Sequence, residues 1–165
     1  MAHFDSIIRQ KELLKGKLLK NQNIVNLLMN TGDNMNEFEQ FKTGSKSPAS
    51  QYIKTHFYVP GTTKKDKNYI TMRSRITYAD SNVVKETNLV IYVICNEDQI
   101  DLIQGSRADL IANEIDKILN NGDEPLFGMG EIVVGVAEEV EFADGFSGWQ
   151  IPYMTKEMNR GAEAL

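Results

Sequence analysis

The stretch from Leu89 to Cys95 constrains the fold of this chain more than any other, because all seven of its side chains are apolar. A helix needs roughly 20 apolar residues to cross a bilayer, so this stretch is far too short to span one. Successive side chains of a strand point to opposite faces of the sheet, so an unbroken apolar run fits a strand that is covered on both faces. We therefore expect Leu89–Cys95 to form a central strand.

Four further segments alternate apolar and polar residues, which is the pattern of a half-buried strand. They span residues 53–59, 70–78, 132–142 and 149–153. Pro152 lies in the last segment and has no N–H to donate to a neighbouring strand. Because proline is largely confined to sheet edges, it predicts that the last strand lies at an edge.

Helical spacing of apolar residues appears twice. The first stripe follows the N-terminal region, with a joint expected near residues 21–23, and consists of Ile7, Leu14, Leu18, Val25 and Leu28. Ser106, with Asp109 three residues later, resembles a capping box and predicts a second helix that ends near residue 120. The expected order is α-β-β-β-α-β-β, an α+β fold whose mostly antiparallel sheet carries two main helices on one face.

The length of 165 residues predicts a single domain over residues 1–165, with a long loop at 32–50 and a strand-connecting turn at 60–68. A hydrophobic share of 41% and a charged share of 25% are those of an ordinary folded protein. Cys95 is the single cysteine, which excludes an intramolecular disulfide and a thiolate zinc site. We expect a protein of a reducing compartment, and the N-terminal region lacks the apolar core of a signal peptide.

The net charge of −5 conceals a division between the two halves of the chain. Residues 1–75 contain 13 Lys and Arg against 6 Asp and Glu, whereas residues 76–165 contain 5 against 17. The lysines are spread over a helix, a loop and a turn, without the clusters typical of nucleic-acid binding. Two interpretations remain: these are solvated faces of one domain, or the basic face of one subunit meets the acidic face of a neighbour.

The segment from Gly32 to Ser50 is polar, yet it contains Met35, Phe38 and Phe41. Loops of this length in compact domains are usually functional or disordered. Apolar side chains in such a loop favour a segment that is mobile in the free subunit and becomes ordered against a partner. The alternative is that these side chains pack back over the domain's own core.

No combination of residues predicts a catalytic centre or a cofactor site. His3 and His56 have no sequence neighbour that would complete a metal site or a nucleophile–base pair, and Cys95 lies in the buried strand. The Gly128–Gly130 stretch precedes a strand, whereas a phosphate-binding loop needs the N-terminus of a helix behind it.

Two groups of acidic residues are candidate sites. Glu97, Asp98 and Asp101 follow the central strand and fit a solvated loop, with a Mg²⁺ site as the less favoured interpretation. Glu138, Glu139 and Glu141 lie on or beside a strand and predict an acidic patch rather than a catalytic acid pair.

The layout resembles the tail-terminator proteins of long-tailed bacteriophages, also called tail-completion or head–tail joining proteins. The stretches that carry this resemblance are Leu89–Cys95, Gly105–Ala112 running into Leu119, and Gly130–Val134. It covers most of the chain as a pattern of elements rather than as a catalytic signature, and the 32–50 segment has no counterpart in it.

The resemblance implies a virion protein that forms a ring, hexameric in that family, which caps the tail tube, stops its polymerisation and joins the neck. Its partners would be further copies of itself, the tail-tube protein and the head-closure or connector protein, with DNA passing through the lumen without specific binding and no membrane involved. An acidic lining would suit such a channel, since like charge keeps phosphates from sticking. Before assembly the protein would reside in the host cytoplasm.

Two sets of residues are candidates for these contacts. The partner or oligomer contacts are expected among Met35, Phe38, Phe41, Lys64, Lys65, Lys67, Phe146 and Trp149. The acidic lumen or inter-subunit patch is expected to comprise Glu97, Asp98, Asp101, Glu138, Glu139 and Glu141. The competing hypotheses are another virion neck or tail protein, such as a head-closure or tail-tube subunit, and a small Mg²⁺-dependent enzyme.

Overall fold

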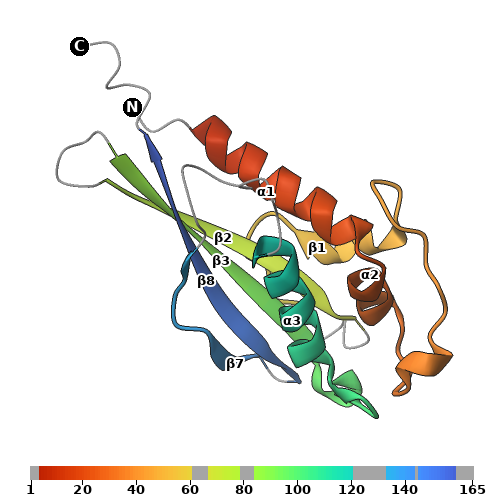
Figure 1. Ribbon diagram of the computed structural model, residues 1–165. Coiled ribbons are helices and arrows are strands. Elements are labelled where there is room, and N and C mark those ends of the chain that lie inside the picture. The colour runs from red at the N-terminus through yellow and green to blue at the C-terminus, as the bar shows by residue number, and fades with distance from the viewer. Residues whose placement is uncertain (1–3, 61–66, 79–83, 121–132, 144, 159–165) are drawn as a thin grey trace.

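The computed structural model describes residues 4–60, 67–78, 84–120, 133–143 and 145–158 (Figure 1). It confirms the α+β class, with helices on one face of a mostly antiparallel sheet. The helices are α1 (Phe4–Lys20), α2 (Gln22–Met29) and α3 (Arg107–Asn120). The strands of the main sheet are β1 (Ile53–Lys54), β2 (Tyr69–Tyr78), β3 (Val84–Asn96), β6 (Val133–Val134), β7 (Glu138–Ala143) and β8 (Phe146–Met158). A separate small hairpin consists of β4 (Asp101–Leu102) and β5 (Gly105–Ser106).

The sheet has the order β1-β2-β3-β8-β6, with β7 also paired to β8. All of these pairs are antiparallel except β1 with β2. The prediction of a central strand is confirmed, because β3 lies in the middle of this order and is buried on both faces. Ile91, Val93 and Cys95 belong to the helix-side core, whereas Tyr92 and Ile94 belong to a second cluster on the opposite face.

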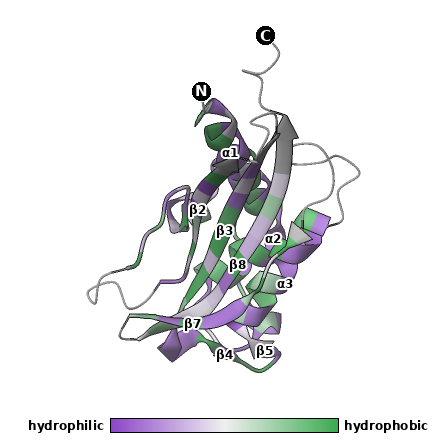
Figure 2. Cartoon of the chain, turned by 90° about the vertical axis from the view of Figure 1, so that its left-hand side faces the viewer, coloured by the Kyte–Doolittle hydropathy of each residue, from purple (hydrophilic) through white to green (hydrophobic). Residues whose placement is uncertain are grey.

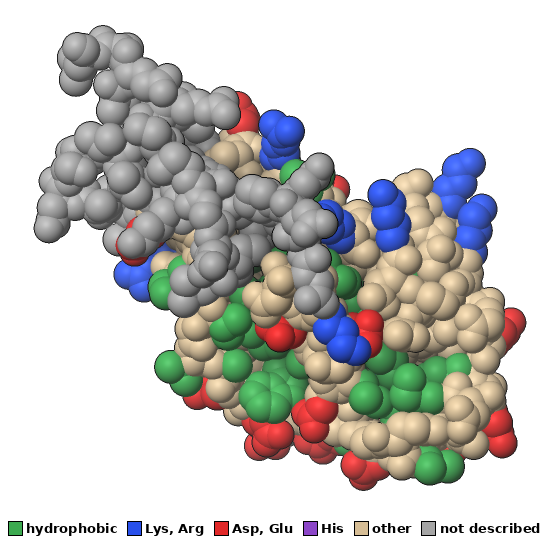
Figure 3. All heavy atoms as spheres, in the orientation of Figure 1, with side chains coloured by type: hydrophobic (Ala, Val, Ile, Leu, Met, Phe, Trp, Pro, Cys, Tyr) green, Lys and Arg blue, Asp and Glu red, His purple; other side chains and the backbone are tan. Residues whose placement is uncertain are grey.

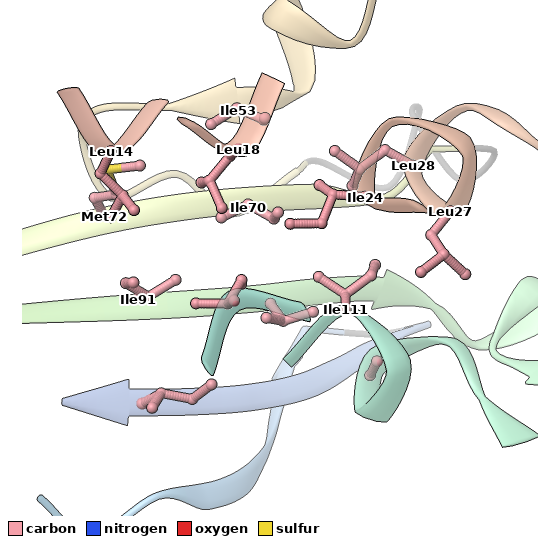
Figure 4. Packing of buried hydrophobic residues seen from close by; sticks show 14 of the residues in the cluster. Leu14, Leu18, Ile24, Leu27, Leu28, Ile53, Ile70, Met72, Ile91 and Ile111 are labelled. Atoms are coloured by element: carbon pink, nitrogen blue, oxygen red, sulfur yellow. The ribbon is translucent and has the colours of Figure 1, made fainter. Parts of the chain in front are cut away.

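The three helices cover one face of the sheet (Figure 1), and four residues of the first apolar stripe, Leu14, Leu18, Val25 and Leu28, are buried in the core cluster. Leu14 and Leu18 of α1 lie over Met72 and Ile70 of β2, while Ile111 of α3 lies beside β3 (Figure 4). The expected joint after the first helix is real: Asn21 caps α2, its side-chain oxygen accepting the backbone N–H of Ile24 at 3.0 Å. Within the described parts of the chain, no helix is long and apolar enough to cross a membrane.

The prediction that Pro152 places the last strand at an edge is wrong. Strand β8 lies between β3 on one side and β6 and β7 on the other. The Pro152 carbonyl accepts the N–H of Gly135 at 2.8 Å, and the N and O of one strand residue point to the same side. The missing N–H therefore faces the gap between β6 and β7, where no ladder bond is needed. For the same reason the single strand expected at 132–142 is divided in two.

The strand expected at 53–59 is also mostly wrong, because only Ile53 and Lys54 pair with β2. The following residues pack aromatic side chains on the face of the sheet opposite the helices. The rings of Phe57 and Tyr92 are 4.7 Å apart, and those of Tyr58 and Tyr69 are 5.3 Å apart. The alternating pattern thus belongs to a segment that covers the sheet rather than to one that extends it.

Candidate functional site

The apolar side chains of the 32–50 segment pack against the protein's own core. This agrees with the alternative that they cover the domain's own core, rather than with the one that they are kept for a partner. Met35, Phe38 and Phe41 are half-buried and lie against the helix-side core cluster. Whether they also contact a partner stays a prediction, but they are not the freely exposed anchors that were expected. This packing could not be inferred from the polar residues around them, because the side chains that bond the segment belong to other parts of the chain.

Arg107 is the centre of that hydrogen-bonding arrangement. Its side chain is fully buried, and its guanidinium donates to the carbonyl of Leu27, to that of Gly32 at 2.9 Å and to that of Gln99 at 2.8 Å. It also lies 5.4 Å from the ring centre of Phe38. Burial lowers the pKa of Arg107. The guanidinium thus joins the C-terminal end of α2 to the start of the 32–50 segment and to the turn after β3.

Side-chain amides hold the rest of the segment. Asn30 pairs with both backbone groups of Glu39, donating to its carbonyl at 3.0 Å and accepting its N–H at 2.9 Å. Gln104 makes a comparable bridge, accepting the N–H of Met35 and donating to the side chain of Asn34, each at 3.0 Å. These bonds satisfy backbone groups that would otherwise need water. Residues 34–39 of the segment are therefore bonded to the rest of the domain, whereas its mobility in the free subunit stays a prediction.

The remaining candidate contact residues lie in three different settings. Lys64 and Lys65 lie outside the described residues, and the Lys67 ammonium lies 5.7 Å from the ring centre of Tyr52. Phe146 is fully buried in the second core cluster, so it is not on the surface of the subunit. Trp149 packs partly against the helix-side core, and its indole N–H donates to Asp109 Oδ1 at 2.6 Å.

The two acidic groups are brought to the same end of the molecule. The N–H of Glu97 donates to the carbonyl of Gly145 at 2.9 Å, which places the turn after β3 beside the β7–β8 hairpin. Figure 3 shows acidic side chains gathered along this lower edge, and Figure 2 shows that β7 is strongly hydrophilic. The exposed members of this acidic edge are Glu97, Asp98, Asp101, Asp109, Glu138, Glu139 and Glu141.

A hollow of about 280 Å³ lies in the acidic edge, between the start of α3 and strands β7 and β8. Asp109, Glu139 and Glu141 contribute carboxylates to its lining. Among the described residues, no group of three or more His, Cys, Asp and Glu side chains is arranged to hold a metal ion. The structure therefore gives no geometric support to a Mg²⁺ site at Glu97, Asp98 and Asp101. Burial raises the pKa of the Cys95 thiol to about 12, which fits a packing role.

The opposite edge of the sheet is basic. A shallow groove of about 520 Å³ runs beside β1 between α1 and the 3-10 turn Pro48–Tyr52. Lys15, Lys54 and His56 line it together with Ser47, Ser50 and Gln51. The Lys54 ammonium lies 5.5 Å from the ring centre of Tyr58. The ion pair between Lys117 and Glu114 lies within α3.

Sequence reasoning missed the residues that define this arrangement. Lys15 and Lys54 are 39 positions apart in the chain, and the parallel pairing of β1 with β2 brings Lys54 to the sheet edge beside α1, so that both line one groove. Asp109 was read only as part of a helix cap, whereas it also binds Trp149 and lines the acidic hollow. The division of charge between the two halves of the sequence was the signal that could have led to both edges.

The sequence model of the YomW family matches residues 21–155, which include α2, α3 and the described sheet except the last three residues of β8. No curated protein matches the chain. The family name is of the kind given to genes of a Bacillus phage region, which suggests a phage-associated protein. Because the match covers most of the sequence, this chain belongs to the YomW family.

Proposed function

We propose that this protein is a structural subunit of a bacteriophage tail or neck. Copies of it associate edge to edge into a ring that ends the tail tube and joins it to the head connector. The proposal combines the phage-type family name with the resemblance to tail-terminator proteins and with the surface of the subunit.

The observation that carries the proposal is the opposite charge of the two sheet edges. Lys15, Lys54 and His56 lie at the β1 edge, and Glu138, Glu139 and Glu141 lie at the β7 edge. A surface that complements a different surface of the same molecule produces head-to-tail contacts. Such contacts close into a ring when each step turns the next subunit by the right angle, and otherwise give a filament.

The acidic residues outside the contact would face the lumen of such a ring. Glu97, Asp98 and Asp101 are exposed. DNA phosphates are repelled by carboxylates, so a lumen lined in this way would let DNA pass without holding it.

Electron microscopy of phage particles tests this function. A phage lacking the gene for this chain should produce heads and separate tail tubes of uncontrolled length, and purified protein added to tubes of normal length should appear as one ring at one end. Protein that binds the side of the tube, or binds only heads, would point to a tail-tube or head-closure role. Normal, infectious particles without the protein would refute a place in the virion.

A further inference from the structure

The basic groove and the acidic edge match each other in more than net charge. Each has one charged residue on the helix side of the sheet and another on the opposite side. At the acidic edge, Glu139 pairs in register with Trp149, whose ring packs on the helix side. Its neighbour Glu138 pairs with Gln150 and therefore faces the opposite side. The acidic edge thus offers carboxylates on both faces.

The basic edge shows the same division. Lys15 belongs to α1, which covers the helix side of the sheet. Lys54 pairs in register with Thr71, and its ammonium lies near the Tyr58 ring, on the opposite side. A neighbouring copy that continues the sheet in the same orientation would bring Glu139 towards Lys15 and Glu138 towards Lys54.

In the part of the chain that the structure describes, neither edge strand has a strand neighbour on its outer side, although the Ile53 N–H of β1 already donates to the carbonyl of Ser50. Among the described residues, β1 pairs only with β2, and β7 pairs only with β8. Exposed strand edges are templates for pairing with another chain. We propose that the β7 edge of one copy docks along the β1 groove of the next, with Lys15 and Lys54 facing Glu139 and Glu138. This inference rests on the proposed ring function and specifies its subunit contact.

A second copy is a better occupant of the groove than nucleic acid. The groove has two lysines and one histidine, whereas the chain as a whole carries a charge of −5, which repels phosphates at long range. The complementary surface is present on every copy of the chain, so no further partner is needed to neutralise the groove.

A charge-swap experiment tests the contact. The groove variant carries Lys15→Glu and Lys54→Glu, and the edge variant carries Glu138→Lys and Glu139→Lys. Sedimentation velocity in low and high salt would follow self-association, both in solution and on purified tail tubes. Each variant alone should associate at least about tenfold more weakly than the wild type, because every contact then sets like charges together. An equal mixture should recover, since each mutated edge then meets a complementary groove.

Matched controls carry the same number of reversed charges away from both edges. Lys42→Glu with Lys117→Glu and Glu39→Lys with Asp116→Lys change exposed positions of the 32–50 segment and of α3. Both should associate as the wild type does. Circular dichroism melting of every variant would separate loss of assembly from loss of folding.

Three results would overturn the contact. They are a groove or edge variant that associates as well as the wild type, a mixture that fails to recover, and a wild type that stays monomeric both in solution and on tubes. If the groove variant assembles normally but no longer binds DNA, the occupant is nucleic acid instead. Rings that cap tubes despite both variants would refute only the contact, whereas charge-dependent assembly without tube capping would refute only the proposed function.

Discussion

Replacing Arg107 with Met should produce one of the largest losses of stability available to a single substitution in this protein. The change keeps most of the apolar stem but removes the guanidinium, leaving the carbonyls of Leu27, Gly32 and Gln99 without their donor. Hydrogen bonds to a charged group contribute about 1.5–3 kcal/mol each, but desolvation of the buried cation offsets much of the sum. Removing one partner of such a buried arrangement costs about 3–5 kcal/mol.

For a domain of this size, a loss of 1 kcal/mol lowers the melting temperature by roughly 2–4 °C, so we expect a decrease of about 10 °C. Urea titration would give the free energy of unfolding, and Arg73→Met, at an exposed arginine, should change it by less than about 0.5 kcal/mol. Arg107→Lys should restore only part of the loss, since one ammonium cannot reach three carbonyls on separate segments. Hydrogen exchange should show faster opening of residues 32–41. A loss below about 1 kcal/mol would refute this account of Arg107.

Three further outcomes can be checked on the purified protein. Gly148→Ala should unfold the protein or lower its stability by more than about 3 kcal/mol, because the new Cβ would lie 1.8 Å from the carbonyl oxygen of Val93. Gly16→Ala, which has open space around it in α1, should raise the stability by up to about 1 kcal/mol. Urea titration measures both changes. Cys95 should resist thiol reagents at pH 8 until the protein unfolds, which labelling followed by mass spectrometry would show. Because burial raises its pKa to about 12, the free energy of unfolding should fall as pH rises from about 9 towards that value, and urea titration at each pH tests this. Replacing Phe38 and Phe41 with Ser should lower the melting temperature clearly, because both rings pack against the core, and an unchanged melting temperature would restore the view of a segment reserved for a partner.

The parts of the fold that could be predicted are those whose signal lies within one element. The apolar run Leu89–Cys95 by itself indicates a strand buried on both faces. The helical spacing of the apolar residues in α1 and α2 by itself indicates helices with one buried face. Pro152 misled because the rule about edges assumes a continuous neighbouring strand, whereas the neighbour here is interrupted opposite the proline. That interruption depends on two segments 17 residues apart meeting in space, as Gly135 meets Pro152.

The 32–50 segment shows why burial of a loop is difficult to infer from its own residues. Its polar composition is typical of an exposed connection. Its backbone groups are satisfied by side chains about 70 positions away: Arg107 donates to the carbonyl of Gly32, and Gln104 accepts the N–H of Met35. The available hint was the asparagine content of residues 21–36, because side-chain amides readily pair with backbone groups. A polar segment beside several such amides, with apolar residues inside it, is better read as one that the domain itself orders.

The two charged edges follow from the order in which the chain builds the sheet. The basic half supplies α1, β1 and β2, and the acidic half supplies the far side, where β7 is paired to β8. Strand β8 pairs with β3, so the acidic β7, which pairs with the other side of β8, lies at the edge opposite β1. A difference of charge along the sequence thereby becomes a difference across the subunit. Had β8 and β7 paired beside β1 instead, the charges would have neutralised each other within one copy, and no complementary surfaces would remain to join copies together.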